Sequence, residues 1–99
     1  MPEDIYFVYM VRCSNGALYT GMTTDLTRRV AEHNGTRGAR YTRLNAPVEL
    51  VWSEIHPNRS SAMKREAQIK RLPRAKKLAL IDAYTSPAKA KWAKADEKP

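Results

Sequence analysis

The sequence predicts an α+β fold, in which helices pack against a small three-stranded sheet that is mixed or antiparallel. Segments rich in β-branched and aromatic residues alternate with segments of helical periodicity, in the order strand, strand, helix, strand, helix, helix. At 99 residues and 42% apolar composition, the chain has room for a single hydrophobic core. We expect one domain over residues 1–84, followed by a basic Ala/Lys/Pro-rich tail over residues 85–99.

The first two predicted strands, residues 5–13 and 17–22, form a hairpin. A two-residue turn places Tyr9 and Tyr19 on opposite faces of the sheet. A three-residue turn over residues 14–16 places both on one face and sets Tyr9 opposite Gly21. Gly21 favours the second register, because a glycine inside a strand leaves room for a neighbouring side chain to approach closely.

Each predicted helix has a start or stop signal. Thr24 is placed to cap the first helix, residues 25–34, and Gly35 follows its last residue. Asn58 or Ser60 caps the second helix, which runs to about residue 72. Since proline suits a first helical turn, a third helix is expected from Pro73 to residue 84.

Several polar side chains fall on inward-facing sides of these helices. Helical periodicity places Arg29 and His33 on the apolar side of the first helix. Arg28 and Glu32 fall on the opposite side, where we expect an ordinary surface pair with no chemical role. In the second helix, Glu66 lies in the middle of the apolar side, which is formed by Ala62, Met63, Ala67 and Ile69.

The third strand and the last helix supply the remaining apolar surface. Alternation along a strand over residues 48–55 predicts that Val48, Leu50 and Trp52 share one face, with Val51 and Ile55 on the other. A basic loop precedes this strand over residues 36–46, and a loop over residues 56–58 follows it. The inward residues of the last helix are expected to be Ala75, Leu78, Ala79 and Ile81.

Positive charge is concentrated in the middle of the chain. The sequence holds 18 Lys and Arg against 10 Asp and Glu, for a net charge of +8 at pH 7. Residues 28–77 contain 13 of the basic residues and four of the acidic ones, so the excess belongs to the folded part rather than to the tail. Such an excess predicts a polyanionic partner, and nucleic acid is the first candidate.

Composition argues against several other classes of protein. The longest apolar run, residues 5–11, is too short to cross a bilayer, so no membrane association is expected. A lone cysteine, Cys13, cannot form an internal disulfide, and acidic residues stand near the N-terminus where a signal peptide carries cations. We therefore expect a cytoplasmic protein. The histidines and the cysteine lie too far apart in sequence to predict a zinc site.

Arg29 and Glu66 both require a partner, because a charge on an inward face is costly unless it is paired or bound. One interpretation is a buried salt bridge that joins the two helices. The other is a cleft in which Glu66 binds a hard cation and Arg29 contacts a phosphate oxygen. These two residues alone do not choose between the interpretations.

Five sequence elements occur together at a characteristic spacing: residues 8–10, residues 19–21, Arg29, His33 and Glu66. In these elements the chain resembles the GIY-YIG nuclease superfamily over residues 5–80, and in particular its small stand-alone bacterial (YhbQ-like) members. The two tripeptides alone are a weak signal, whereas all five elements in register are a strong one.

The resemblance implies hydrolysis of phosphodiester bonds by Tyr9, Tyr19, Arg29, His33 and Glu66. It also implies one divalent cation, Mg²⁺ or Mn²⁺, with Glu66 as the protein ligand and no small-molecule cofactor. We expect Tyr9 to activate the attacking water as a phenolate favoured by Arg29 and the nearby cation, while Tyr19 and His33 orient that water. Further contacts to nucleic acid are expected from Arg37, Arg40, Tyr41, Arg43, Lys70 and Arg71.

The resulting hypothesis is a monomeric DNA endonuclease of DNA repair or processing, structure-directed or of low sequence specificity, with RNA as the other possible substrate. A domain this small has no additional module that reads a long sequence. One alternative is a nucleic-acid-binding module on the same fold without turnover. Another is an interaction protein in which Arg29, His33 and Glu66 form a structural network, which predicts no effect of metal ions.

Overall fold

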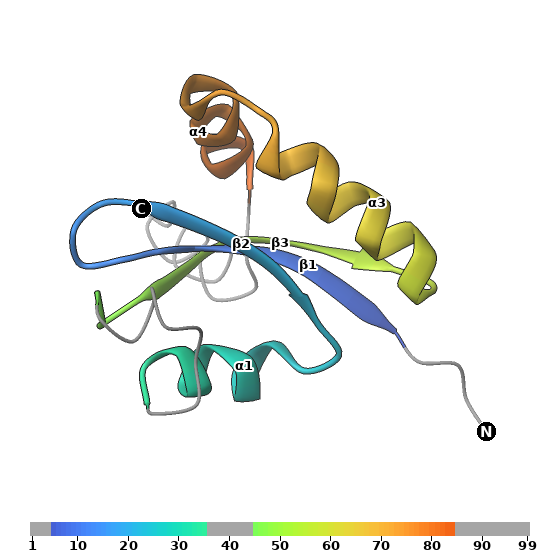
Figure 1. The fold of residues 1–99 in the computed structure, drawn as a ribbon, viewed down its shortest axis with the longest axis horizontal. Coiled ribbons are helices and arrows are strands. Elements are labelled where there is room, and N and C mark those ends of the chain that lie inside the picture. Colours follow the sequence, from blue (N-terminus) through green and yellow to red (C-terminus); the bar gives the residue numbers. More distant parts are fainter. Residues whose placement is uncertain (1–4, 36–44, 85–99) are drawn as a thin grey trace, which may run out of the picture.

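The computed structural model describes residues 5–35 and 45–84. Three strands form one antiparallel sheet in the order β2-β1-β3, and helices lie on both of its faces (Figure 1). The predicted α+β fold is therefore confirmed, with an antiparallel rather than a mixed sheet. The described elements are β1 (Tyr6–Arg12), β2 (Leu18–Thr23), α1 (Leu26–His33), β3 (Glu49–His56), α3 (Arg59–Lys70) and α4 (Arg74–Ala83).

The hairpin between β1 and β2 has the three-residue turn. Gly16 adopts a φ of 89°, and its N–H donates to the carbonyl of Cys13 at 2.9 Å. A left-handed glycine at this position is what a three-residue hairpin loop requires. Tyr9 consequently pairs with Gly21, and Tyr19 pairs with Val11, so the register that puts both tyrosines on one face is confirmed.

The pairing between β1 and β3 contains a bulge that the alternation along β3 did not predict. Met10 pairs with Trp52 but Val11 pairs with Leu50, which leaves Val51 as the additional residue. The additional residue shifts the alternation of side chains between the two faces of the sheet. Leu50 and Trp52 therefore pack into different cores. The prediction that they share a face was therefore wrong.

The helix caps follow the sequence signals with one correction. Asp25, not Thr24, caps α1, because the Asp25 side chain accepts a hydrogen bond from the Arg28 N–H at 3.0 Å while its own backbone is extended. Asn58 caps α3 by accepting from the Ser61 N–H at 2.8 Å, which selects one of the two predicted caps. Pro73 directly precedes α4.

The sheet separates two apolar clusters, with α1 on one face and α3 and α4 on the other (Figure 1). We call them the α1-side core and the α3-side core. The α1-side core contains buried Tyr9, Val11, Cys13 and Val48. The α3-side core contains buried Val8, Met10, Trp52, Ala62, Ile69 and Ile81, with Leu78 packed against it.

The predicted inward orientation was wrong for four residues, which are exposed: Met63, Ala67, Ala75 and Ala79. Each helix rests on a single layer of sheet, so it buries a narrower stripe than a helix surrounded by neighbours. None of the helices in residues 5–35 and 45–84 is long and apolar enough to cross a membrane. Residues 36–44 of the predicted basic loop and the predicted tail, residues 85–99, lie outside the described part.

Candidate active site

Tyr9 lies at the centre of the candidate site. Its side chain projects from the middle strand β1 across Gly21 of the edge strand β2 and is only 1% exposed. A Cβ at Gly21 would lie 2.5 Å from the Tyr9 hydroxyl oxygen, so the phenol occupies space that only a glycine leaves. The hydroxyl lies 2.7 Å from Nε2 of His33 and forms a hydrogen bond with it.

His33 is the last residue of α1 and is completely buried. Its ring packs against both tyrosines, with centroid separations of 5.7 Å to Tyr9 and 5.2 Å to Tyr19. The Tyr19 contact is edge to face, which is a favourable geometry for aromatic rings. The structure thus brings together the two tyrosines and the histidine that the sequence predicted to share a site.

Arg29 lies one turn before His33 on α1, with its side chain 26% exposed. Its guanidinium donates to Oε1 of Glu32 at 2.9 Å, whereas Arg28 is 3.9 Å from the other oxygen of Glu32. The predicted surface pair of Arg28 and Glu32 is present, but the shorter ion pair of Glu32 with Arg29 was not predicted. Glu32 holds the Arg29 guanidinium in place. Helical periodicity did not predict this contact, because it places Glu32 on the side of the helix opposite Arg29.

The pKa values of the hydrogen-bonded pair shift in opposite directions. Burial raises the pKa of the Tyr9 phenol, and this exceeds the lowering caused by the hydrogen bond and positive charge of Arg29. Burial also lowers the pKa of His33, and the charge of Arg29 lowers it further. Both groups are therefore uncharged at neutral pH in the protein without a bound cation.

Glu66 lies on α3, which covers the opposite face of the sheet from α1 (Figure 1). Its side chain is 23% exposed, and Oε2 lies 3.5 Å from Nζ of Lys70. Its negative charge is the smallest of the causes that raise the pKa of Tyr9, after burial and the charge of Tyr19.

Arg29 and Glu66 do not form a salt bridge with each other. Within residues 5–35 and 45–84, Arg29 is paired with Glu32, and Glu66 is paired with Lys70. The interpretation of a salt bridge that joins the two helices was therefore wrong. Both charged groups are partly exposed, so a phosphate oxygen and a cation can reach them.

The Glu66 carboxylate is the candidate ligand for a divalent cation. No group of three or more His, Cys, Asp or Glu side chains that could hold a metal occurs in the part of the chain that the structure describes. A lone carboxylate completed by water and substrate oxygens is a common environment for Mg²⁺, whereas a two-metal site needs more carboxylates. Glu66 is the residue that fits such an ion.

Asn34 fixes the end of α1 against the sheet and was not identified from the sequence. Its Oδ1 accepts from the Val48 N–H at 2.6 Å, and its Nδ2 donates to the Val48 carbonyl at 3.1 Å. Since Asn34 directly follows His33, this pair of bonds positions the histidine relative to the start of β3. The only signal in the sequence was an asparagine at the end of a helix, and the sequence does not identify its partner.

The structure also places the residues predicted to contact nucleic acid and the predicted loop residue His56. Lys70 lies beside Glu66, and Arg71 follows the end of α3 on another side of that helix. His56, predicted in a loop, is the last residue of β3 and bonds Ser61 and Glu54, so that prediction was wrong. Outside the described residues lie Arg37, Arg40, Tyr41 and Arg43.

Comparisons with known proteins agree with this geometry. The model of the GIY-YIG catalytic domain matches residues 5–79. A UPF0213 protein of Staphylococcus aureus is 50% identical over 78 residues, which cover 79% of this chain and 95% of the relative.

Two solved structures have a similar fold. The solution structure of a UPF0213 protein from Bacillus halodurans has a TM-score of 0.56 and 38% identity, and the match covers 86% of this chain and 90% of that one. The solution structure of a protein from E. faecalis has a TM-score of 0.53 and 40% identity, covering 77% of this chain and 81% of that one. The similarity extends over nearly all of the described residues in sequence and in fold.

Proposed function

Because the chain belongs to the GIY-YIG catalytic domain family, which implies a nuclease-type function, we propose that it is a divalent-metal-dependent DNA endonuclease. The proposed reaction is hydrolysis of phosphodiester bonds, directed by DNA structure or of low sequence specificity, in DNA repair or processing. One observation supports this above the others. The Tyr9 hydroxyl bonds Nε2 of His33 at 2.7 Å, while Arg29 and Glu66 pair with Glu32 and Lys70 rather than with each other.

The attacking water is deprotonated through Tyr9 in the proposed mechanism. A neutral phenol is a weak base, but its hydroxyl already bonds Nε2 of His33. As the Tyr9 oxygen takes a proton from water, its own proton passes to Nε2 of His33. The hydroxide forms a bond to phosphorus while the bond between phosphorus and the 3′-oxygen breaks. The lowered pKa of His33 keeps the imidazole neutral and able to accept that proton at physiological pH.

Arg29 stabilises the charge that builds on the phosphoryl oxygens. Its guanidinium is held by Glu32 and retains further N–H donors for a phosphate. Glu66 would hold the divalent cation, which supplies charge stabilisation of the departing 3′-oxygen. Tyr19 packs against the edge of His33 and keeps the imidazole aligned with Tyr9.

A second candidate is a nucleic-acid-binding module without turnover. Tyr9 and His33 are only 1% and 0% exposed, and water must reach the Tyr9 hydroxyl for the proposed mechanism to operate. This burial favours a structural use of the same residues. Cleavage under metal-replete conditions distinguishes the two candidates.

The test is nicking of supercoiled plasmid DNA in Mg²⁺ or Mn²⁺ by the full chain and by Glu66→Gln. We expect the substitution to lower the nicking rate by at least about 100-fold, because it removes the only proposed protein ligand of the cation. Glu49→Gln, an equivalent change of an exposed carboxylate on β3, serves as the matched control and should nick at the wild-type rate.

Binding measured in EDTA completes the test. Glu66→Gln should bind DNA as well as the wild-type chain, which shows that the loss of nicking is not a loss of binding. A Glu66→Gln chain that nicks at the wild-type rate would remove Glu66 from the mechanism. A wild-type chain that binds DNA but never nicks it under these conditions would establish the second candidate.

A further inference from the structure

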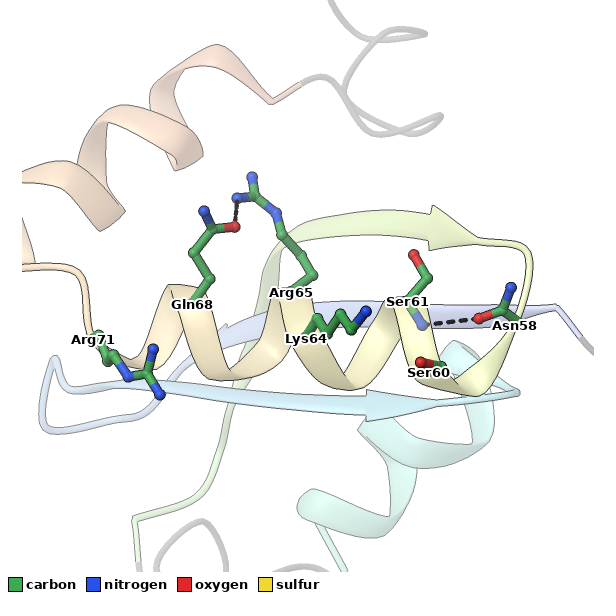
Figure 2. Close-up of a pocket in the computed structure, with 7 residues that line it drawn as sticks. All are labelled: Asn58, Ser60, Ser61, Lys64, Arg65, Gln68 and Arg71. Carbon is green, nitrogen blue, oxygen red and sulfur yellow. Dashed lines mark hydrogen bonds between the residues drawn. The ribbon is translucent and has the colours of Figure 1, made fainter.

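A shallow hollow runs along α3 on a side that does not include Glu66. Figure 2 shows its side chains spaced along the whole helix, from Asn58 at the start to Arg71 just past the end. The active-site residues of α1 and the sheet do not contribute to it. The hollow is lined by Asn58, Ser60, Ser61, Lys64, Arg65, Gln68 and Arg71.

The chemistry of this lining is that of a phosphate-contacting surface. It contains three cations, two hydroxyls and two side-chain amides, and it contains no carboxylate. Arg, Lys, Ser, Asn and Gln are the side chains that contact DNA phosphates most often. Lys64 and Arg71 form no ion pair with any residue in 5–35 or 45–84, so their charges are available to a partner.

Arg65 is held in a fixed orientation at the side of the hollow. Its Nε donates to Oε1 of Glu54 at 2.9 Å. A terminal nitrogen donates to Oε1 of Gln68 at 2.6 Å, the bond drawn in Figure 2. The guanidinium also lies over the ring of Trp52 at 5.9 Å. Two of its five N–H groups are used in these bonds, and the others remain for an anion.

Hydrogen bonds of His56, at the end of β3, help to hold the Glu54 carboxylate that binds Arg65. Nε2 of His56 lies 2.7 Å from the Glu54 carboxylate that binds Arg65, and Nδ1 of His56 lies 2.6 Å from the hydroxyl of Ser61. The wall of the hollow is therefore tied to the sheet through Glu54 and His56. Such a support lowers the entropy that Arg65 loses when it binds a ligand.

The length of the hollow suits an extended polyanion. At a rise of about 1.5 Å per residue, the helix covers about 16 Å between Ser60 and Arg71. Over that length of the DNA helix axis, one strand of a duplex carries about five phosphates. A single small anion would use only one part of this surface.

We propose that the hollow is a second phosphate-contacting surface, which binds the backbone of the nucleic acid away from the phosphate that is cleaved. The inference rests on the proposed function for the identity of the partner as DNA. It assigns Lys64, Arg65 and Arg71 to binding, separate from Tyr9 and Glu66. Contacts at this surface increase the affinity of the chain for DNA and do not involve the reacting atoms.

The test measures how DNA binding depends on salt. A fluorescein-labelled duplex of about 30 base pairs is titrated in EDTA with the full chain, with Lys64→Gln/Arg71→Gln, and with Lys76→Gln/Lys77→Gln. The last pair removes the same charge from α4, outside the hollow. Circular dichroism confirms that each variant is folded before binding is measured.

Loss of two phosphate contacts should reduce the magnitude of the slope of log K against log salt by about 1.8 and weaken binding by up to about 60-fold at 0.1 M salt. The Lys76→Gln/Lys77→Gln control should keep the wild-type slope. Equal slopes for the wild-type chain and the Lys64→Gln/Arg71→Gln variant would overturn the proposal, as would an equal loss in the control.

The outcome is independent of catalysis, because binding is measured without metal. If the slope falls as expected while Glu66→Gln nicks plasmid at the wild-type rate, the phosphate-contacting surface stands and the proposed mechanism fails. If the slope is unchanged while Glu66→Gln loses nicking, the mechanism stands and the second surface is rejected.

Discussion

The two faces of the sheet use the same central strand for different purposes. Val8 and Met10 of β1 point into the α3-side core, where every fully buried side chain is apolar among the residues described. Tyr9, between them, points to the other face and bonds the buried imidazole of His33. Alternation along one strand therefore supplies stability on one face and reactive groups on the other.

This difference predicts that mutations on the two faces will have different consequences. Removing apolar atoms from the α3-side core costs free energy of unfolding with little effect on the geometry around Tyr9. The α1-side core has a buried hydrogen bond whose loss leaves a polar group without a partner, so changes there affect both stability and the site. The predictions below test this separation.

The largest expected effect on stability is that of Ile69→Ala. Ile69 is completely buried in the α3-side core, and truncation of such a residue lowers the free energy of unfolding by about 2–5 kcal/mol. Met63→Ala on the same helix is the control, because Met63 is 45% exposed and should change stability by less than about 0.5 kcal/mol. Urea unfolding measures both. Equal effects of the two substitutions would contradict the burial pattern of α3.

Gly21→Ala tests the face that carries Tyr9. The new Cβ would lie 2.5 Å from the Tyr9 hydroxyl oxygen and 2.8 Å from Cζ, so the ring must shift and its hydrogen bond with His33 is disturbed. We expect a loss of about 1–3 kcal/mol in the free energy of unfolding, together with a loss of DNA nicking. Gly35→Ala is the control, since its Cβ would come no closer than 3.4 Å to the carbonyl of Ala31.

A double-mutant cycle with Tyr9→Phe shows whether the hydroxyl is the cause. Removing the closest atom should make Gly21→Ala less destabilising in the Tyr9→Phe background than in the wild-type chain. Identical costs in both backgrounds would mean that Gly21 does not serve to admit the phenol.

The fold was predictable from the sequence because its signals are local. The spacing of Ser14-Asn15-Gly16 and the glycine at position 21 selected the hairpin register that the structure has. The bulge at Val51 was not predictable, because it depends on the pairing of β3 with β1 rather than on the residues of β3 alone. The exposure of Ala67 and Ala79 was missed for a similar reason, since periodicity does not show how many layers cover a helix.

The candidate site was predictable only as a set of residues. The inward positions of Arg29, His33 and Glu66 followed from helical periodicity, and the resemblance to a nuclease family supplied their roles. The pairing of Arg29 with Glu32 and the clamp of Asn34 on Val48 depend on side-chain geometry and tertiary contact. The raised pKa of Tyr9 was not predicted, because the burial of a phenol does not follow from its place in the sequence.

The smallest predicted effect is the dependence of stability on pH that His33 contributes. Its pKa is lowered in the folded chain, so below about pH 6.5 the unfolded state binds a proton that the folded state does not. Stability should therefore fall as the pH falls from 6.5 towards the folded-state pKa, by at most about 1.4 kcal/mol per pH unit. His33→Gln removes the titrating group, so its stability should change less over the same range.

The measurement is urea unfolding of both chains at several pH values between 7 and 5. Because the two chains differ only at residue 33, the difference between their pH dependences measures the contribution of His33. A wild-type chain that is no more sensitive to acid than His33→Gln would mean that the imidazole is not held neutral against Tyr9. The α1-side core would then lack the proton acceptor that distinguishes it from the α3-side core.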